Sequence, residues 1–407
     1  MVDTENDANK QKVSTMKTLL EIFVVSTRLG LTSFGGPVAH LGYFHEEYVR
    51  RRKWMDEQAY ADLVALCQFL PGPASSQVGI GIGVMRAGAI GGILAFIGFT
   101  FPSVIALLFF ASFLHIFDVS RAGWLHGLKL VAVAIVAHAI MGMAKNLTPD
   151  LQRRTIAVFA MVFTLLLQTT YTQIGVILLS GLIGYLIYRQ EETVQEDLKA
   201  AVRFPLSRKF ATISLCLFFG LLVVLPIIKE LTASNYITLF DSFYRSGSLV
   251  FGGGHVVLPL LEREFVPTGW LSEEQFLAGY GATQAVPGPL FTFAAYIGAV
   301  AYGWQGGLIA TIAVFLPAIL LVFGTLPFYD ALRRNPKIKS IFMGINAAVV
   351  GILIAAFYNP VWTSSIFAPI DFAIASILFF LLAYWKLPPW IIVIAGAMGG
   401  TLQSLFM

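Results

Sequence analysis

Long apolar runs recur along almost the whole 407-residue chain, and they constrain its fold more than any other feature. They lie at 91–113, 128–144, 156–167, 174–187, 213–228, 308–326, 347–357, 372–384 and 391–398. The longest match the roughly 20 residues that a helix needs to cross a bilayer. Only 12% of the residues are charged and 57% are hydrophobic, which is too little charge for the surface of a soluble domain. We therefore expect an all-α polytopic membrane protein.

The polar features of the chain exclude several classes of protein. Residues 1–16 are polar and mixed in charge, which predicts a short cytoplasmic tail and not a signal peptide. The net charge of +4 comes from clusters in loops and gives no reason to expect nucleic acid as a partner. The sequence has no phosphate-binding loop motif and no metal-ligand spacing. We therefore expect no cofactor, no enzyme activity and no ATP-driven transport.

The chain also repeats itself, at an offset that drifts from 217 residues (Gly35 to Gly252) to 215 (Pro102 to Pro317). FGG at 34–36 recurs at 251–253, PGP at 71–73 recurs at 287–289, and Gln68 recurs as Gln284. Internal repeats of this kind are typical of secondary transporters.

The repeat predicts the domain organisation. A tail at 1–16 precedes a first transporter repeat at 17–189, a charged cytoplasmic linker at 190–209, a connecting transmembrane helix at 210–229 and a second repeat at 230–407. One extra crossing between repeats with an even number of crossings turns the second repeat upside down. Basic loop residues, which mark the cytoplasmic side, occupy complementary loops in the two halves, which favours inverted repeats. Two parallel repeats are the alternative.

Each half begins with two interrupted helices. Gly35-Gly36-Pro37 and Pro71-Gly72-Pro73 break apolar stretches that basic residues flank on both sides. Pro and Gly leave backbone groups unpaired, which a membrane protein tolerates only inside protein or beside a watery cavity. We therefore expect two re-entrant helical hairpins per half, and full crossings are the alternative, with the same inverted topology.

The breaks predict a binding site for an anion near mid-membrane. A helix that starts at such a break has unpaired N–H groups and the positive end of its dipole. A plain kink without a ligand is the alternative reading. The predicted site residues at the breaks are Gly35, Gly36, Pro71, Gly72, Pro73, Ala74, Ser75, Ser76, Gln77, Gly252, Gly253, Gln284, Pro287, Gly288, Pro289 and Thr292.

Arg28 and Arg245 occupy matching positions, seven residues before the first glycine of each FGG motif. Charges inside a membrane usually mark function, and arginine suits oxyanions, so we expect this pair to bind a dianion. A snorkelling arginine or a structural pair with a carboxylate is the alternative. Lys129 and its repeat partner Asn346 are further candidates for substrate binding. The alternative is that Lys129 is an ordinary lysine near a helix end.

Glu47 and Glu264 occupy matching positions after the first break of each half. They are candidates for coupling to protons, and a solvated or salt-bridged face is the alternative. His40, His45 and His255 also follow the glycine breaks, but they face unlike residues in the repeat, so no shared role follows.

The motifs resemble one known family, the chromate ion transporter family in its long, two-domain form. The resemblance rests on FGGPVAHLGYFHEEYV (34–49), LCQFLPGPASSQ (66–77), GGILAFIGFTFPS (91–103), FGGGHVVLPLLEREFV (251–266) and QAVPGPLFTFAAYIG (284–298). It implies a multi-pass inner-membrane protein that exports chromate and confers chromate resistance, with sulfate as the natural mimic. Leu290 and Phe291 replace the polar turn of the first half, so the two halves are not equivalent.

Together these features predict a secondary transporter for chromate or a sulfate-like dianion that works by alternating access within membrane lipid. A carrier for sulfate or another oxyanion and an anion channel are the alternatives, and saturation of the flux distinguishes a carrier from a channel. Selectivity between chromate and sulfate, the direction of transport, the coupling ion and the oligomeric state, a homodimer included, do not follow from the sequence.

Overall fold

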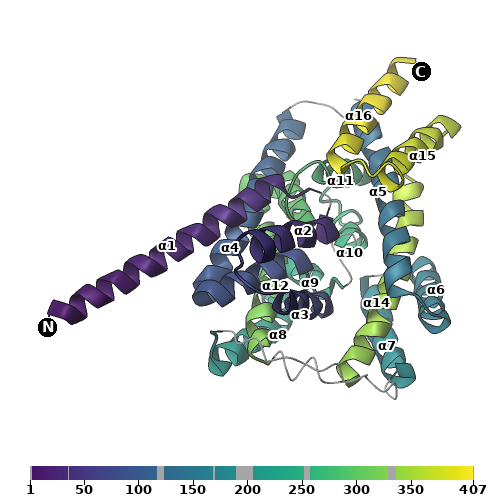
Figure 1. Cartoon of the computed structure of the whole chain (residues 1–407). Coiled ribbons are helices and arrows are strands. Elements are labelled where there is room, and N and C mark those ends of the chain that lie inside the picture. The colour runs from purple at the N-terminus through teal and green to yellow at the C-terminus, as the bar shows by residue number, and fades with distance from the viewer. Residues whose placement is uncertain are drawn as a thin grey trace.

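The computed structural model describes residues 2–34, 36–116, 123–167, 170–188, 205–251, 257–328 and 336–406, and every regular element in these ranges is helical (Figure 1). The first half contains α1 (Val2–Thr32), α2 (Gly36–Phe44), η1 (His45–Arg51), α3 (Glu57–Phe69), α4 (Ala74–Ile116), α5 (Gly123–Leu147), α6 (Leu151–Leu166) and α7 (Thr170–Tyr188). After α8 (Arg208–Thr232), the second half contains α9 (Asn235–Leu249), α10 (Val257–Phe265), α11 (Glu273–Thr283), η3 (Leu290–Thr292), α12 (Phe293–Thr325), η4 (Leu326–Phe328), α14 (Pro336–Ala356), η5 (Phe357–Trp362), α15 (Pro369–Ala383) and α16 (Pro389–Phe406).

Several of these helices are suited to lipid. Five described segments are long and apolar enough to cross a membrane: Ala74–Leu114, Gly123–Leu147, Arg208–Thr232, Leu290–Phe328 and Lys337–Trp362. Their outward faces expose large apolar side chains such as Phe109, Phe219 and Ile312. A soluble protein exposes few such side chains together, so these faces lie against acyl chains. The structure thus confirms the predicted all-helical membrane protein.

The two halves bend at matching residues. α4 breaks at Ala87 and Gly88, where Gly88 has φ 66° and ψ −159°. α12 breaks at Tyr302 and Gly303, where Gly303 has φ 64° and ψ −166°. The chain therefore repeats its backbone conformation as well as its sequence.

In each half, the segment around the PGP motif folds back so that its beginning and its end lie side by side. The Arg86 guanidinium, at the end of the first part of α4, lies 4.5 Å from the ring centroid of Trp54, which precedes α3. Arg86 also pairs with Glu21 of α1 at 3.2 Å. In the second half, the ring of Trp270 before α11 lies 5.4 Å from that of Tyr302, at the break in α12. The PGP motif thus forms the tip of a helical hairpin in both halves.

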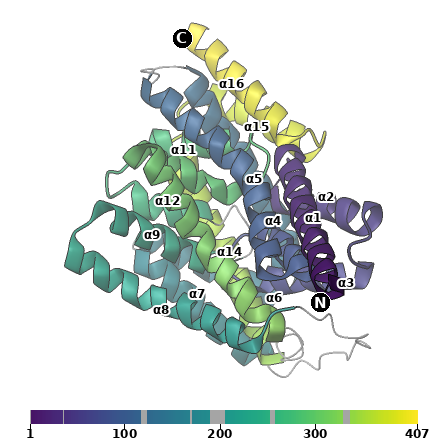
Figure 2. The same ribbon diagram turned by 90° about the vertical axis from the view of Figure 1, so that its left-hand side faces the viewer.

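The halves are interleaved. α5 of the first half packs against α15 and α16 of the second, while α14 of the second half packs against α6 and α7 of the first (Figure 2). Small residues permit this approach: a Cβ atom on Gly127 would lie 2.1 Å from the Gly396 oxygen, and one on Gly344 would lie 2.0 Å from the Ser180 oxygen. The two halves therefore pack closely against each other.

The ends of the repeats differ from their cores. α1 begins at Val2, so the polar first residues continue directly into the apolar helix, which projects from the other helices in Figure 1. Most of the predicted linker lies outside the described residues. α8 covers the predicted connecting segment and extends it by a few residues at both ends.

Candidate functional site

The two PGP tips each donate a backbone hydrogen bond to the other half of the chain. The Gly72 N–H donates to the Val250 oxygen at 2.7 Å, and the Gly288 N–H donates to the Ser33 oxygen at 2.9 Å. Ser33 and Val250 are equivalent residues that directly precede the two FGG motifs. Four broken segments, two from each half, therefore meet at one place.

Each tip glycine also contacts a transmembrane helix of the opposite half. Gly72 has φ +114°, and a Cβ atom on it would lie 3.0 Å from the Cβ of Ala318 on α12. Gly288 has φ +103°, and a Cβ atom on it would lie 2.7 Å from the Oγ of Ser103 on α4. Ala318 and Ser103 are again equivalent residues of the repeat. Glycine is required at both tips because its backbone is left-handed and its α-carbon is closely packed.

Polar side chains of the first half gather around this crossing, and we call Ser33, His40, Ser76, Gln77 and Thr100 the tip cluster. The His40 Nδ1 atom lies 3.3 Å from the Ser75 Oγ, and the Gln77 Nε2 donates to the Pro71 oxygen at 2.8 Å.

Each member of the tip cluster is buried and keeps one polar atom without a hydrogen-bond partner in the described part of the chain. These atoms are Ser33 Oγ, His40 Nε2, Ser76 Oγ, Gln77 Oε1 and Thr100 Oγ1. Buried polar groups are almost always satisfied, so these five unsatisfied atoms indicate a ligand or bound water.

The start of α4 adds a further feature. Ala74 is half-buried at the first helical position and Ser75 and Ser76 follow it, both buried. The first N–H groups of a helix have no partner within the helix and form the positive end of its dipole. The tip cluster therefore lies beside amide donors that suit an anion.

The equivalent residues of the second half are mostly apolar. Ser33, His40, Ser75, Gln77 and Thr100 are matched by Val250, Val257, Phe291, Phe293 and Phe315. Thr292, which matches Ser76, keeps its hydroxyl, but this donates to the Pro289 oxygen at 2.7 Å. The second half thus contributes backbone and apolar surface to the crossing, and the first half contributes the polar atoms.

The remaining predicted tip residues lie in different surroundings. Pro71 and Pro73 are buried, and Pro287 is half-buried. Gln284 is 6% exposed and its Nε2 has no partner among the described residues, whereas the equivalent Gln68 is exposed. Gly36 begins α2, while the predicted Gly35, Gly252 and Gly253 lie outside the described residues.

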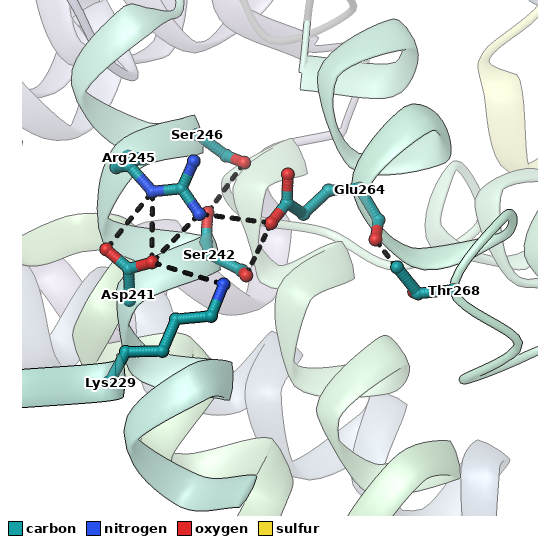
Figure 3. A network of polar contacts seen from close by, with 7 residues as sticks. All are labelled: Lys229, Asp241, Ser242, Arg245, Ser246, Glu264 and Thr268. Atoms are coloured by element: carbon teal, nitrogen blue, oxygen red, sulfur yellow. Dashed lines mark hydrogen bonds and ion pairs between the residues drawn. The ribbon is translucent and has the colours of Figure 1, made fainter. Parts of the chain in front are cut away.

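Arg245 belongs to a network of charges between α8, α9 and α10 (Figure 3). Its guanidinium donates to the Asp241 carboxylate at 2.8 and 3.1 Å and to Glu264 at 3.2 Å. Lys229 lies 3.9 Å from Asp241, and the Ser242 hydroxyl donates to Glu264 at 2.6 Å. Arg245 and the predicted coupling residue Glu264 thus belong to one ion-pair network with Asp241, and their roles in binding and coupling stay predictions.

Arg28 lies in quite different surroundings. It is exposed on α1, one helical turn from exposed Val24 and on the same face as exposed Leu20 and Leu31. No ion pair of Arg28 occurs within the described residues. In the structure Arg245 is held by carboxylates and Arg28 is exposed on α1, and binding of a dianion by this pair stays a prediction.

The other predicted polar residues lie in the helical scaffold. Lys129 is buried on α5, where its Nζ donates to the Ser364 oxygen at 3.1 Å and lies 5.4 Å from the Phe367 ring centroid. The Oδ1 of Asn346 on α14 is buried and has no partner among the described residues. Glu47 is buried and accepts hydrogen bonds from Arg51 and Arg52, with which it forms ion pairs.

Ser33, Thr100 and Ser103 are parts of the crossing that the sequence did not identify. Ser33 and Thr100 do not belong to a paired motif, and Ser103 lies one residue after Pro102, which recurs as Pro317. The signal that could have found them is the contrast between halves, because each is polar where its equivalent is apolar.

Broken helices that meet inside a bundle of apolar spans define a membrane transporter, not an enzyme. A family model described as chromate transporter matches residues 20–185 and 237–401, which lie in the two halves. The chain belongs to the chromate transporter family, in its two-domain form, as the resemblance predicted.

Curated relatives agree with this assignment. An uncharacterized transporter of Methanocaldococcus jannaschii is 28% identical over 388 residues, 93% of this chain and 92% of the relative. A probable chromate transport protein of Synechococcus elongatus is 28% identical over 368 residues, covering 88% and 87%. A chromate transport protein of Pseudomonas aeruginosa is 27% identical over 360 residues, covering 85% and 82%. No solved structure matches the chain.

Proposed function

We propose that this chain is a secondary transporter that exports chromate across the inner membrane and confers chromate resistance. The observation that carries the proposal is the tip cluster: five buried polar atoms without a partner among the described residues, near the start of α4 and the PGP tips. Amide and hydroxyl donors at a helix start suit a tetrahedral oxyanion. Two of the relatives are named for chromate transport, which supports chromate as the substrate.

The mechanism we propose is alternating access between two inverted halves. The complementary basic loops and the matching hairpins support the inversion. The two hairpins also differ in packing, since Gln284 of one is buried while Gln68 of the other is exposed. A Cβ atom on Gly281 of α11 would lie 2.5 Å from the Leu128 oxygen of α5, so the second hairpin is docked tightly on the scaffold. In alternating access the binding site is closed to one side of the membrane while it is open to the other, so the two hairpins must pack differently in each state.

The test is uptake of labelled chromate into everted vesicles, with Ser76→Ala as the variant. Ser112→Ala is a matched control, because Ser112 is also on α4 but is exposed and bonds only to its own helix at the Leu108 oxygen. Ser76→Ala should raise the KM for chromate several-fold, because it removes a hydrogen bond to a charged ligand. Equal KM values for both variants and wild type would contradict the site, and a flux that never saturates would indicate a channel.

Export and resistance have a separate test. Expression of the chain in a chromate-sensitive bacterium should raise the chromate concentration that stops growth, and the Ser76→Ala variant should lose part of that gain. Faster chromate entry into the expressing cells would instead indicate uptake.

A further inference from the structure

The tip cluster contains no Lys, Arg, Asp or Glu, and His40 is its one titratable side chain. α2 and α12 contain no Lys, Arg, Asp or Glu, and Arg86 is the one such residue on α4. Arg86 pairs with Glu21 at the end of the hairpin, away from the tip. An anion at the crossing would therefore depend on neutral donors and on the dipole of α4.

The other charged groups on neighbouring elements are also engaged elsewhere. Arg28 of α1 is exposed, and Glu47 forms ion pairs with Arg51 and Arg52. Arg245 forms ion pairs with Asp241 and Glu264. The groups against the His40 ring are Ser75, the backbone of Ser33 and Phe99, whose ring centroid is 5.4 Å away. No described charged side chain is thus left to neutralise a dianion there.

The number of charges on the ligand therefore matters greatly. The cost of moving an ion out of water scales with the square of its charge, so a monoanion costs about a quarter of what a dianion of the same size costs. One helix dipole and a few hydroxyls can compensate a single charge far better than two.

Gln77 adds a second and independent preference. Its Nε2 donates to the Pro71 oxygen at 2.8 Å, and because a carbonyl can only accept, the orientation of the amide is fixed. Its Oε1 is then a buried acceptor without a partner, in a side chain that is fully buried. An unprotonated oxyanion offers that atom only lone pairs, whereas a protonated one offers a hydroxyl.

We propose that the tip cluster binds the oxyanion in its singly protonated, monoanionic form, whose hydroxyl donates to Gln77 Oε1 while its other oxygens accept from Ser76 and the first amides of α4. This inference rests on the proposed function and names the ionic form of its substrate. Each transported anion then carries one proton and one negative charge. Chromate takes up a proton near neutral pH, whereas sulfate remains a dianion, so the site selects chromate over sulfate although the two have the same shape.

The first experiment measures binding and uptake of chromate at micromolar concentration, between pH 6 and pH 8.5, with the purified full chain in vesicles. Above neutral pH the apparent KM for total chromate should rise about tenfold per pH unit, because only the protonated fraction binds. Sulfate and selenate should compete weakly at every pH tested, and phosphate, which is protonated near neutral pH, should compete better. A KM that is independent of pH, or sulfate that competes as well as chromate at pH 8, would overturn the proposal.

The second experiment separates Gln77 from His40. Gln77→Leu should reduce the preference for chromate over sulfate several-fold, because it removes the acceptor that disfavours an unprotonated ligand. His40→Gln, which keeps a hydrogen-bonding side chain, should leave the pH profile in place, since the titrating group is the ligand. A profile that disappears in His40→Gln, or an unchanged selectivity in Gln77→Leu, would refute this assignment. Absence of chromate flux and binding at every pH would overturn the proposed function itself.

Discussion

Replacing Gly288 by alanine tests whether the crossing of the tips holds the two halves together. Gly288 has φ +103°, where a Cβ atom is strained, and its Cβ would lie 2.7 Å from Ser103 Oγ and 3.3 Å from Ser103 Cβ. The backbone strain costs about 1–3 kcal/mol and the overlap about 1–3 kcal/mol, so the variant should lose about 2–6 kcal/mol. That is a large part of the stability of an ordinary domain.

The assay for Gly288→Ala is the melting temperature in detergent together with chromate uptake in vesicles. Gly269→Ala is the control, because Gly269 also has a positive φ (+76°) but has nothing within 4 Å of a new Cβ, so it should cost only the strain. Adding Ser103→Ala to Gly288→Ala removes the closest atom and should restore part of the loss. If Gly288→Ala melts and transports as the wild type does, the crossing does not have the close packing described.

Three further predictions concern the scaffold. Arg245→Ala should destabilise the protein by about 2–3 kcal/mol, because the buried negative charge of Asp241, only 1% exposed, loses its nearest cation. Arg245→Lys should destabilise the protein less. A melting temperature of Arg245→Ala equal to that of the wild type would contradict the network. Burial alone would raise the pKa of the Asp150 carboxyl, but hydrogen bonds from Arg153 outweigh it and lower that pKa. The ionised Asp150 carboxylate therefore stabilises the fold fully above the ordinary carboxyl pKa, and this stabilisation is lost as the pH falls through the lowered pKa. The melting temperature of Asp150→Asn should therefore fall less than that of the wild type below about pH 4. An equal fall in both proteins would contradict this role of Asp150. Gly344→Leu should abolish folding measured by monodisperse yield, because its Cβ would lie 2.0 Å from a backbone oxygen; normal yield would refute the close helix contact.

The sequence predicted the parts of the fold that follow from composition and local pattern. The apolar runs predicted the spans, and the paired PGP motifs predicted two tips because glycine and proline end helices wherever they cluster. The sequence analysis did not predict the kinks at Gly88 and Gly303, although these residues occupy equivalent positions and have nearly the same backbone angles.

The sequence could not predict contacts between distant segments. The bond from Gly288 to Ser33 joins residues on opposite halves, and no local pattern encodes it. The arginines illustrate the same limit: equivalent positions suggested equal roles, but Asp241 lies one turn before Arg245 while Val24 lies one turn before Arg28. A carboxylate at i−4 captures one arginine, and its absence leaves the other exposed.

The location of chromate in a structure of the full chain in lipid, determined by electron microscopy with chromate added at low pH, tests the central claim most directly. The account predicts density for one tetrahedral anion within hydrogen-bond reach of Ser76 Oγ and Gln77 Oε1, between the Gly72 and Gly288 tips. Density beside Arg28 or Arg245 instead, with water alone at the tips, would contradict it.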